Sequence, residues 1–218
     1  RAISAASYSR EYGTERVQYY ALRNGSNVDR RLLAQLAAEL PRSLAIDDRP
    51  AQTIAQLERA ARATRRKHKR LDLIVVDYLQ LMTSKRSDGR VNEVTEISQG
   101  LNALAKRLGV PVLALSQLSR GVESRDNKRP TLADLRDSGA IEQDADVVIG
   151  CYRPAYYLER AEPDAGDAEG WAKWKTALAR CCNDFEAIVL KQRAGPIGTV
   201  RLICHLEFDT ILDQRGAA

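Results

Sequence analysis

An aspartate stands directly after a continuous apolar run in the sequence Leu73-Ile74-Val75-Val76-Asp77. Such a run is typical of a strand buried in a parallel sheet, and open α/β sheets bind their ligands at the carboxyl ends of these strands. Mg²⁺ prefers water together with one or two oxygen ligands, so Asp77 is a candidate to hold a hydrated Mg²⁺ ion. The alternative is an aspartate that only forms the turn after the strand.

Polar side chains also end two later apolar runs. Gln117 follows Leu113-Ala114-Leu115-Ser116, and its amide is placed to hydrogen-bond a phosphate in the crevice that Asp77 faces. Lys191 and Arg193 close the run that begins at Ala187, and residues two apart on a strand point the same way. Such a pair of cations is able to reach a phosphate held by a neighbouring subunit. Taken alone, Gln117 is better explained as a polar residue in a loop at a strand end, and Lys191 and Arg193 fit equally well as solvated surface cations.

A fourth segment, residues 134–146, has a composition that would suit a loop that binds a nucleic-acid strand. Arg136 can contact a phosphate, and the backbone N–H groups near Gly139 can point at another. The segment holds no aromatic residue for base stacking, so a nucleic acid bound here would be held by its backbone and not by its sequence. The alternative is a loop that caps a helix.

Strands that alternate with helices are needed to position these residues. Five apolar runs predict strands at about 71–76, 112–115, 147–151, 187–190 and 199–204, and residues 43–46 predict a further short buried strand. Thr53 and Gln56 form the capping-box signature of a helix that runs to about His68. Helical spacing of apolar residues over 94–108 predicts a second helix, ended by Gly109. The pattern predicts an α/β fold with a mainly parallel sheet covered by helices on both faces.

The chain is predicted to form a single domain over residues 1–218, with a surface insertion at about 154–184. The insertion contains a predicted helix around residues 171–181, and Trp171 and Trp174 are expected to pack it onto the body of the domain. Short helical pieces are expected over 131–143, and residues 195–198 predict a turn between the last two strands. The basic run Arg62 to Arg70 lies at a helix end, where a solvated face is favoured over a nucleic-acid patch.

Composition excludes several classes of protein. Charged residues make up 29% of the chain and the net charge is +5, which suits a globular protein and is compatible with a polyanionic partner. No apolar run approaches the roughly 20 residues that span a bilayer, so no membrane partner is expected. The four cysteines form no C-x-x-C pair, which argues against a zinc site and predicts reduced, mostly buried thiols.

In this order and spacing the segments resemble the DnaB family of hexameric replicative DNA helicases. Residues 71–82 are similar to the family's Walker B segment, and residues 111–120, 129–146 and 191–198 are similar to its later motifs. The resemblance implies a RecA-like P-loop NTPase fold with ATP and Mg²⁺ as cofactors. It implies 5'–3' unwinding of duplex DNA at the replication fork by a homohexamer that moves on single-stranded DNA. It also implies a primase and a helicase loader as partners, in the bacterial cytoplasm in association with the nucleoid.

The resemblance also implies a role for each candidate residue. Asp77 would be the Walker B carboxylate for Mg²⁺, and Gln117 would couple the γ-phosphate to the DNA-binding loops. Lys191 and Arg193 would act on the ATP of the adjacent subunit. The DNA-gripping loop of the central channel would contain Arg136, Asp137 and Gly139; the family usually has glutamate where this chain has Asp137.

The phosphate-loop signature G-x-x-x-x-G-K-[ST] does not occur in the sequence. In the family that loop and its strand, followed by the catalytic glutamate, precede the motifs found here. The chain is therefore expected to be an incomplete motor domain, inactive alone, with a gap in its sheet where the missing strand would lie. Two alternatives remain, namely a filament-forming recombination or repair ATPase of the RecA type, and a non-catalytic module that joins a helicase ring.

Overall fold

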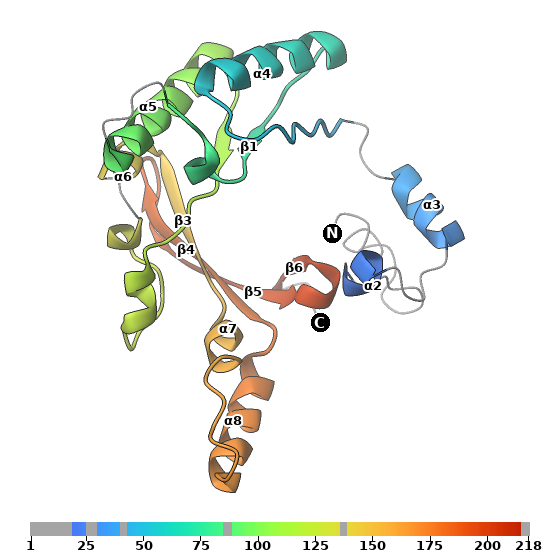
Figure 1. Ribbon diagram of the computed structural model, residues 1–218, viewed down its shortest axis with the longest axis vertical. Coiled ribbons are helices and arrows are strands. Elements are labelled where there is room, and N and C mark those ends of the chain that lie inside the picture. The colour runs from blue at the N-terminus through green and yellow to red at the C-terminus, as the bar shows by residue number, and fades with distance from the viewer. Residues whose placement is uncertain (1–18, 25–29, 40–42, 85–88, 136–138, 215–218) are drawn as a thin grey trace. The chain divides into compact units, whose positions relative to one another are not determined.

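The computed structural model describes residues 19–24, 30–39, 43–84, 89–135 and 139–214 (Figure 1). The chain divides into two compact units. The first, called here the site unit, comprises residues 43–150 and 189–198; the second, the arm unit, comprises residues 1–42, 151–188 and 199–218. Each unit is described by itself below.

Two helices form the outer layer of the site unit. Helix α4 spans Ile54–His68 and begins at the predicted capping box, since Thr53 accepts a hydrogen bond from the Gln56 N–H while the Gln56 side chain accepts one from the Thr53 N–H. Helix α5 spans Arg90–Leu108 and ends at Gly109, which adopts the left-handed conformation with φ of 62°. Both predicted helices and both caps are confirmed.

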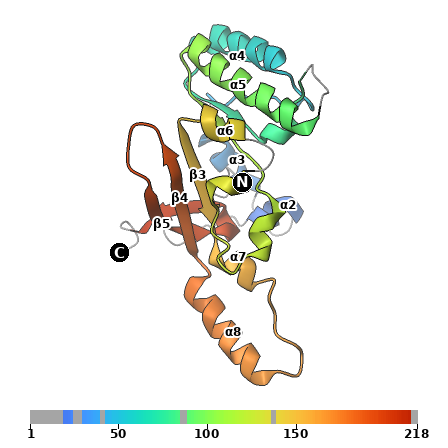
Figure 2. The ribbon, with the colours of Figure 1, turned by 90° about the vertical axis from the view of Figure 1, so that its left-hand side faces the viewer.

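Helices α4 and α5 lie side by side (Figure 2). Glu58 of α4 pairs with Arg62 on its own helix at 2.7 Å and with Arg107 of α5 at 2.8 Å. Arg65 donates to the Leu108 carbonyl at 3.2 Å, where α5 ends. The basic run is exposed, as predicted, and one of its cations, Arg65, also joins the two helices.

Two short parallel strands lie beneath these helices. Strand β1 (Ile74–Val76) pairs with β2 (Val112–Ala114), with Val76 opposite Ala114. Ile74 and Val76 are buried in one core with apolar residues of α4 and α5. The alternate residues Leu73, Val75 and Leu113 are 49%, 53% and 52% exposed. The expectation that both sheet faces are covered is therefore wrong in the part of the chain that the structure describes.

Short turns and a helix follow each of these strands. The 3₁₀ turns are η1 (Leu79–Leu81) after β1, then η2 (Arg120–Ser124) and η3 (Leu132–Asp134) after β2. They lead to α6 (Gly139–Asp144) and to strand β3 (Val147–Tyr152). In β3, a Cβ at Gly150 would lie 3.0 Å from the Pro130 Cβ, so the glycine allows the loop to pack against the strand. The short helical pieces predicted over 131–143 are confirmed as η3 and α6.

The described strands form two separate sheets. One is β1–β2, and the other has the order β3-β4-β5-β6, with β4 at Asp184–Gln192, β5 at Gly198–His205 and β6 at Thr210–Asp213. Strands β2 and β3 are thus not paired in the described part of the chain. Strands β5 and β6 are antiparallel, and β6 was not predicted from the sequence.

The arm unit contains four helices in its described residues: α2 (Tyr19–Asn24), α3 (Arg30–Glu39), α7 (Pro154–Leu158) and α8 (Ala168–Cys181). It also contains the turn η4 (Leu206–Phe208). Helix α8 confirms the helix predicted in the insertion. Trp174 donates its ring N–H to the Leu158 carbonyl, and Trp171 donates to the Asp164 carbonyl. Both partners belong to the insertion, so each tryptophan ring N–H is satisfied within it.

Two further expectations are wrong. Residues 43–46 form no strand, and Ile46 is 81% exposed, because no described strand lies beside them to pair with. Of the four cysteines only Cys204 is buried, while Cys151 and Cys182 are exposed. Among the described residues no helix has both the length and the apolar character to cross a membrane.

Candidate functional site

Asp77 lies at the carboxyl end of β1, directly after the buried Val76. Its side chain is exposed, and the Asp77–Tyr78 peptide bond is cis. Because β1 and β2 are parallel, the segments that follow them leave the sheet at the same edge. Asp77 and Gln117 therefore belong to one edge of the sheet, as the sequence predicted.

Gln80 links the two strand ends. Its amide nitrogen donates to the Ser116 hydroxyl at 3.0 Å, and its amide oxygen accepts the Gln117 N–H at 3.2 Å. The backbone adds a further bond, in which the Leu79 N–H donates to the Leu115 carbonyl at 2.8 Å. The Gln117 backbone is thereby fixed, while its side chain is exposed and able to meet a ligand.

The residues at this edge suit a hydrated magnesium ion. They offer one exposed carboxylate, from Asp77, and neutral oxygens from the Gln117 and Ser116 side chains. No group of three His, Cys, Asp or Glu side chains gathers among the described residues, so a cage made of protein carboxylates is excluded for that part of the chain. Mg²⁺ commonly keeps several waters and takes one or two carboxylates together with substrate phosphates, which agrees with this donor set.

Lys191 and Arg193 are held together on a different segment, around the end of α6. Lys191 donates to the backbone carbonyl of Glu142, and Arg193 pairs with the Asp146 carboxylate at 2.6 Å. The Arg193 N–H also donates to the Asp146 carbonyl. None of these contacts involves Asp77. Both members of the Arg193–Asp146 pair are more than half exposed, so the pair is weak and can be exchanged for a stronger anion.

Two of the three predicted DNA-binding residues, Arg136 and Asp137, lie outside the described residues. The third, Gly139, is the exposed first residue of α6. A Cβ added at Gly139 would meet nothing within 4 Å. This end of α6 therefore leaves room for an approaching backbone.

Two features of the site were missed from the sequence. Gln80 is one; its signal was a single polar residue within the apolar run Leu79-Gln80-Leu81-Met82. The other is the buried Asp134 with its partner Arg125, which holds the loop before α6. Nothing in the local pattern of a polar, basic loop indicated that one of its carboxylates is buried.

Comparison with known proteins gives a consistent picture. The family model described as the DnaB-like helicase C terminal domain matches residues 11–213. The replicative DNA helicase DnaB of Rickettsia bellii (strain RML369-C) is 48% identical over 187 residues, which is 84% of this chain and 37% of that protein. The DnaB protein of Pasteurella multocida (strain Pm70) is 41% identical over 209 residues, 92% of this chain and 41% of that protein. The chain thus spans about two-fifths of the length of these curated relatives.

Solved structures agree in fold. One solved ATPase domain has a TM-score of 0.77 at 31% identity, covering 97% of this chain and 68% of that one. A DnaB-like replicative helicase, solved in a study of its interactions with primase, has a TM-score of 0.76 at 31% identity, covering 97% of this chain and 47% of that one. The RecA-like fold inferred from the sequence is confirmed, and the chain belongs to the family of DnaB-like helicase C-terminal domains.

Proposed function

We propose that this chain provides most of the motor of a replicative DNA helicase, in which ATP hydrolysis between neighbouring subunits drives 5'–3' unwinding. The observation that carries the proposal is the pairing of strand ends. Asp77 and Gln117 leave one edge of a parallel sheet together, fixed by Gln80, and they expose a carboxylate and an amide. That combination suits Mg²⁺ and a terminal phosphate.

Each side chain has a defined task in this proposal. Asp77 would hold the water shell of a Mg²⁺ ion, and that ion would neutralise the negative charge of the ATP phosphates during phosphoryl transfer. Gln117 donates a hydrogen bond from its side-chain amide nitrogen to an oxygen of the γ-phosphate, so its position differs between the ATP and ADP states. A phosphate-loop signature is absent from this sequence, so the proposal places the phosphate loop outside these residues.

Lys191 and Arg193 serve the ATP of the adjacent subunit. Their contacts are two backbone carbonyls and one exposed carboxylate of the α6 region. A phosphate carries more charge than these partners and accepts paired hydrogen bonds from arginine, so it competes well for both cations. Lys191 and Arg193 lie far from Asp77 in the sequence, and none of their contacts named above involves Asp77. Both observations support an action across a subunit boundary.

The DNA contact is assigned to Arg136 and Asp137, which precede α6 in the sequence, and to Gly139, the first residue of α6. An arginine and backbone N–H groups at this place bind phosphates of single-stranded DNA without reading its sequence. A homohexameric ring supplies one such loop from each subunit. The partners proposed with it are a primase and a helicase loader, and the proposed location is the bacterial cytoplasm at the nucleoid.

Mixed assemblies test the assignment across subunits. In the complete gene product that contains these residues, Asp77→Asn and Arg193→Ala are each expected to lower single-stranded-DNA-dependent ATPase at least about a hundredfold. When the two variants are co-assembled at equal amounts, about a quarter of the interfaces combine an intact Asp77 with a neighbour's intact Arg193. ATPase activity is therefore expected to return to about that fraction.

The matched controls are Asp72→Asn and Arg70→Ala, an exposed ion pair just before β1 whose loss should change neither activity nor recovery. No recovery in mixed assemblies would place Arg193 in its own subunit's site and overturn the trans assignment. Electron microscopy of the wild-type product with ATP and DNA separates the alternatives: closed rings support a helicase, and filaments support a recombination ATPase. Rings without any ATPase activity would support the non-catalytic module.

A further inference from the structure

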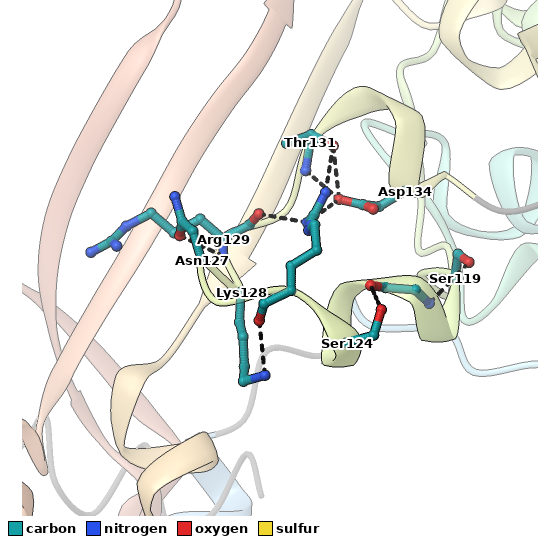
Figure 3. Close-up of polar contacts among 9 residues, drawn as sticks. Ser119, Ser124, Asn127, Lys128, Arg129, Thr131 and Asp134 are labelled. Carbon is teal, nitrogen blue, oxygen red and sulfur yellow. Dashed lines mark hydrogen bonds and ion pairs between the residues drawn. The ribbon is translucent and has the colours of Figure 1, made fainter.

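One buried carboxylate holds the loop between β2 and α6. Asp134 is 6% exposed and accepts three hydrogen bonds: from the Thr131 N–H at 2.7 Å, the Thr131 hydroxyl at 2.8 Å and Arg125 Nη2 at 2.7 Å (Figure 3). A buried carboxylate is costly unless such donors satisfy it. The carboxylate therefore fixes the geometry of the residues that donate to it.

Arg125 extends this contact across the loop. Besides pairing with Asp134, its Nη2 donates to the Arg129 carbonyl at 3.0 Å. Lys128 in turn donates to the carbonyls of Glu123 at 2.7 Å and Arg125 at 3.0 Å. Arg125 and Lys128 thus cross-link the loop from residue 119 to 134 through hydrogen bonds to backbone carbonyls and to one carboxylate (Figure 3).

The closed loop fixes the two chain segments that enter and leave it. The Ser119 N–H donates to the Asp134 carbonyl at 2.8 Å, and Leu118 forms an isolated antiparallel bridge with Leu135. Leu118 directly follows Gln117, and Leu135 directly precedes Arg136. A single bridged residue pair therefore separates the proposed phosphate sensor from the proposed DNA-binding segment.

We propose that Asp134 and Arg125 are positioning residues that couple the nucleotide state at Gln117 to DNA binding at Arg136, through the Leu118–Leu135 bridge. This inference rests on the proposed function. A lone bridge holds its register weakly, because it lacks the ladder of a full strand pair. The buried Asp134 carboxylate supplies the missing constraint, so a displacement of Gln117 reaches the next segment without being lost in the loop.

The test compares two aspartates on the same loop in the complete gene product. Asp134→Asn removes the buried charge, whereas Asp126→Asn makes the same chemical change at an exposed position next to Arg125. ATP turnover is measured with and without oligo(dT), over a range of oligonucleotide concentrations. Asp134→Asn is expected to lower the ratio of DNA-stimulated to basal turnover about tenfold, and Asp126→Asn to leave that ratio unchanged.

Arg125→Lys and Arg125→Gln give a second, graded measurement that does not depend on the Asp134 variant. Lysine keeps a cation for Asp134 but loses the forked geometry, so its coupling ratio is expected to lie between wild type and Arg125→Gln. A coupling ratio equal to wild type in both Asp134→Asn and Arg125→Gln would overturn the inference. So would an equal fall in basal and stimulated turnover, which is the signature of a merely structural role. A wild-type protein without DNA-stimulated ATPase would instead defeat the proposed function.

Discussion

At the scale of single residues, Asp134 makes stability depend on pH in a predictable direction. Burial alone would raise the pKa of Asp134, but the hydrogen bonds from Thr131 and Arg125 outweigh it and hold that pKa below its usual value. A carboxyl whose pKa is lower in the folded state stabilises the fold above its unfolded-state pKa. That stabilisation is lost as the pH falls through the folded-state pKa.

Asp134→Asn is therefore expected to lower the free energy of unfolding by about 1–2 kcal/mol at pH 7. The difference from wild type should persist down to about pH 4 and shrink below it, because the wild-type carboxyl then takes up a proton. Urea denaturation at pH values from 3 to 7 measures this, with Asp126→Asn as the control. A difference that stays constant down to pH 3 would contradict the assigned role of the Asp134 charge.

The sequence predicted those site residues that end apolar runs. It did not predict those whose position depends on a partner far away in the sequence. Asp77 and Gln117 follow apolar runs that were predicted to be parallel strands, so their place at one edge followed from strand direction. Gln80 reaches Ser116, 36 residues further along the chain, and no local pattern encodes that contact. The same holds for Lys191 and the carbonyl of Glu142, 49 residues apart.

At the scale of elements, the start of α4 is stabilised by its cap. Thr53→Ala removes the side-chain acceptor for the Gln56 N–H and is expected to lower the free energy of unfolding by about 1 kcal/mol. Thr95→Ala is the matched control inside α5, where the hydroxyl bonds only the Val91 carbonyl. Alanine has the higher helix propensity, so this control is expected to change stability by less than about 0.5 kcal/mol, or to raise it. Equal losses in both variants, measured by urea denaturation, would show that the capping box contributes nothing of its own.

Helices were predicted more accurately than strands, for a physical reason. The capping box that begins α4 and the glycine that ends α5 are local signals, because a helix satisfies its backbone within one segment. A strand needs a neighbour. Residues 43–46 have strand-like composition but remain exposed without a partner, whereas the unpredicted β6 exists because β5 lies beside it. Val75 was predicted to be buried on the same grounds and is half exposed.

At the scale of the whole molecule, the short sheet of β1 and β2 exposes an apolar face. Leu73, Val75, Leu113 and Leu115 lie on β1, β2 and the residues that flank them, and each is more than two-fifths exposed. Apolar side chains clustered on a sheet face normally pack against another layer. In the complete gene product this face is therefore expected to be covered by a further layer.

The sequence contains no phosphate-loop signature, and the contacts proposed for Asp77 and Gln117 do not include a cradle for the β- and γ-phosphates. The 218 residues by themselves are therefore expected to hydrolyse no ATP. The measurement is ATP turnover at saturating Mg²⁺ and oligo(dT), with Asp77→Asn in the same 218 residues as the zero point. Wild type and Asp77→Asn are expected to be indistinguishable, although the same substitution lowers turnover at least about a hundredfold in any longer product of the gene that contains a phosphate loop. Turnover by the wild-type 218 residues above that of Asp77→Asn would mean that residues within this chain hold the nucleotide without the loop. The division of the motor between this chain and a separate phosphate-binding segment would then be wrong.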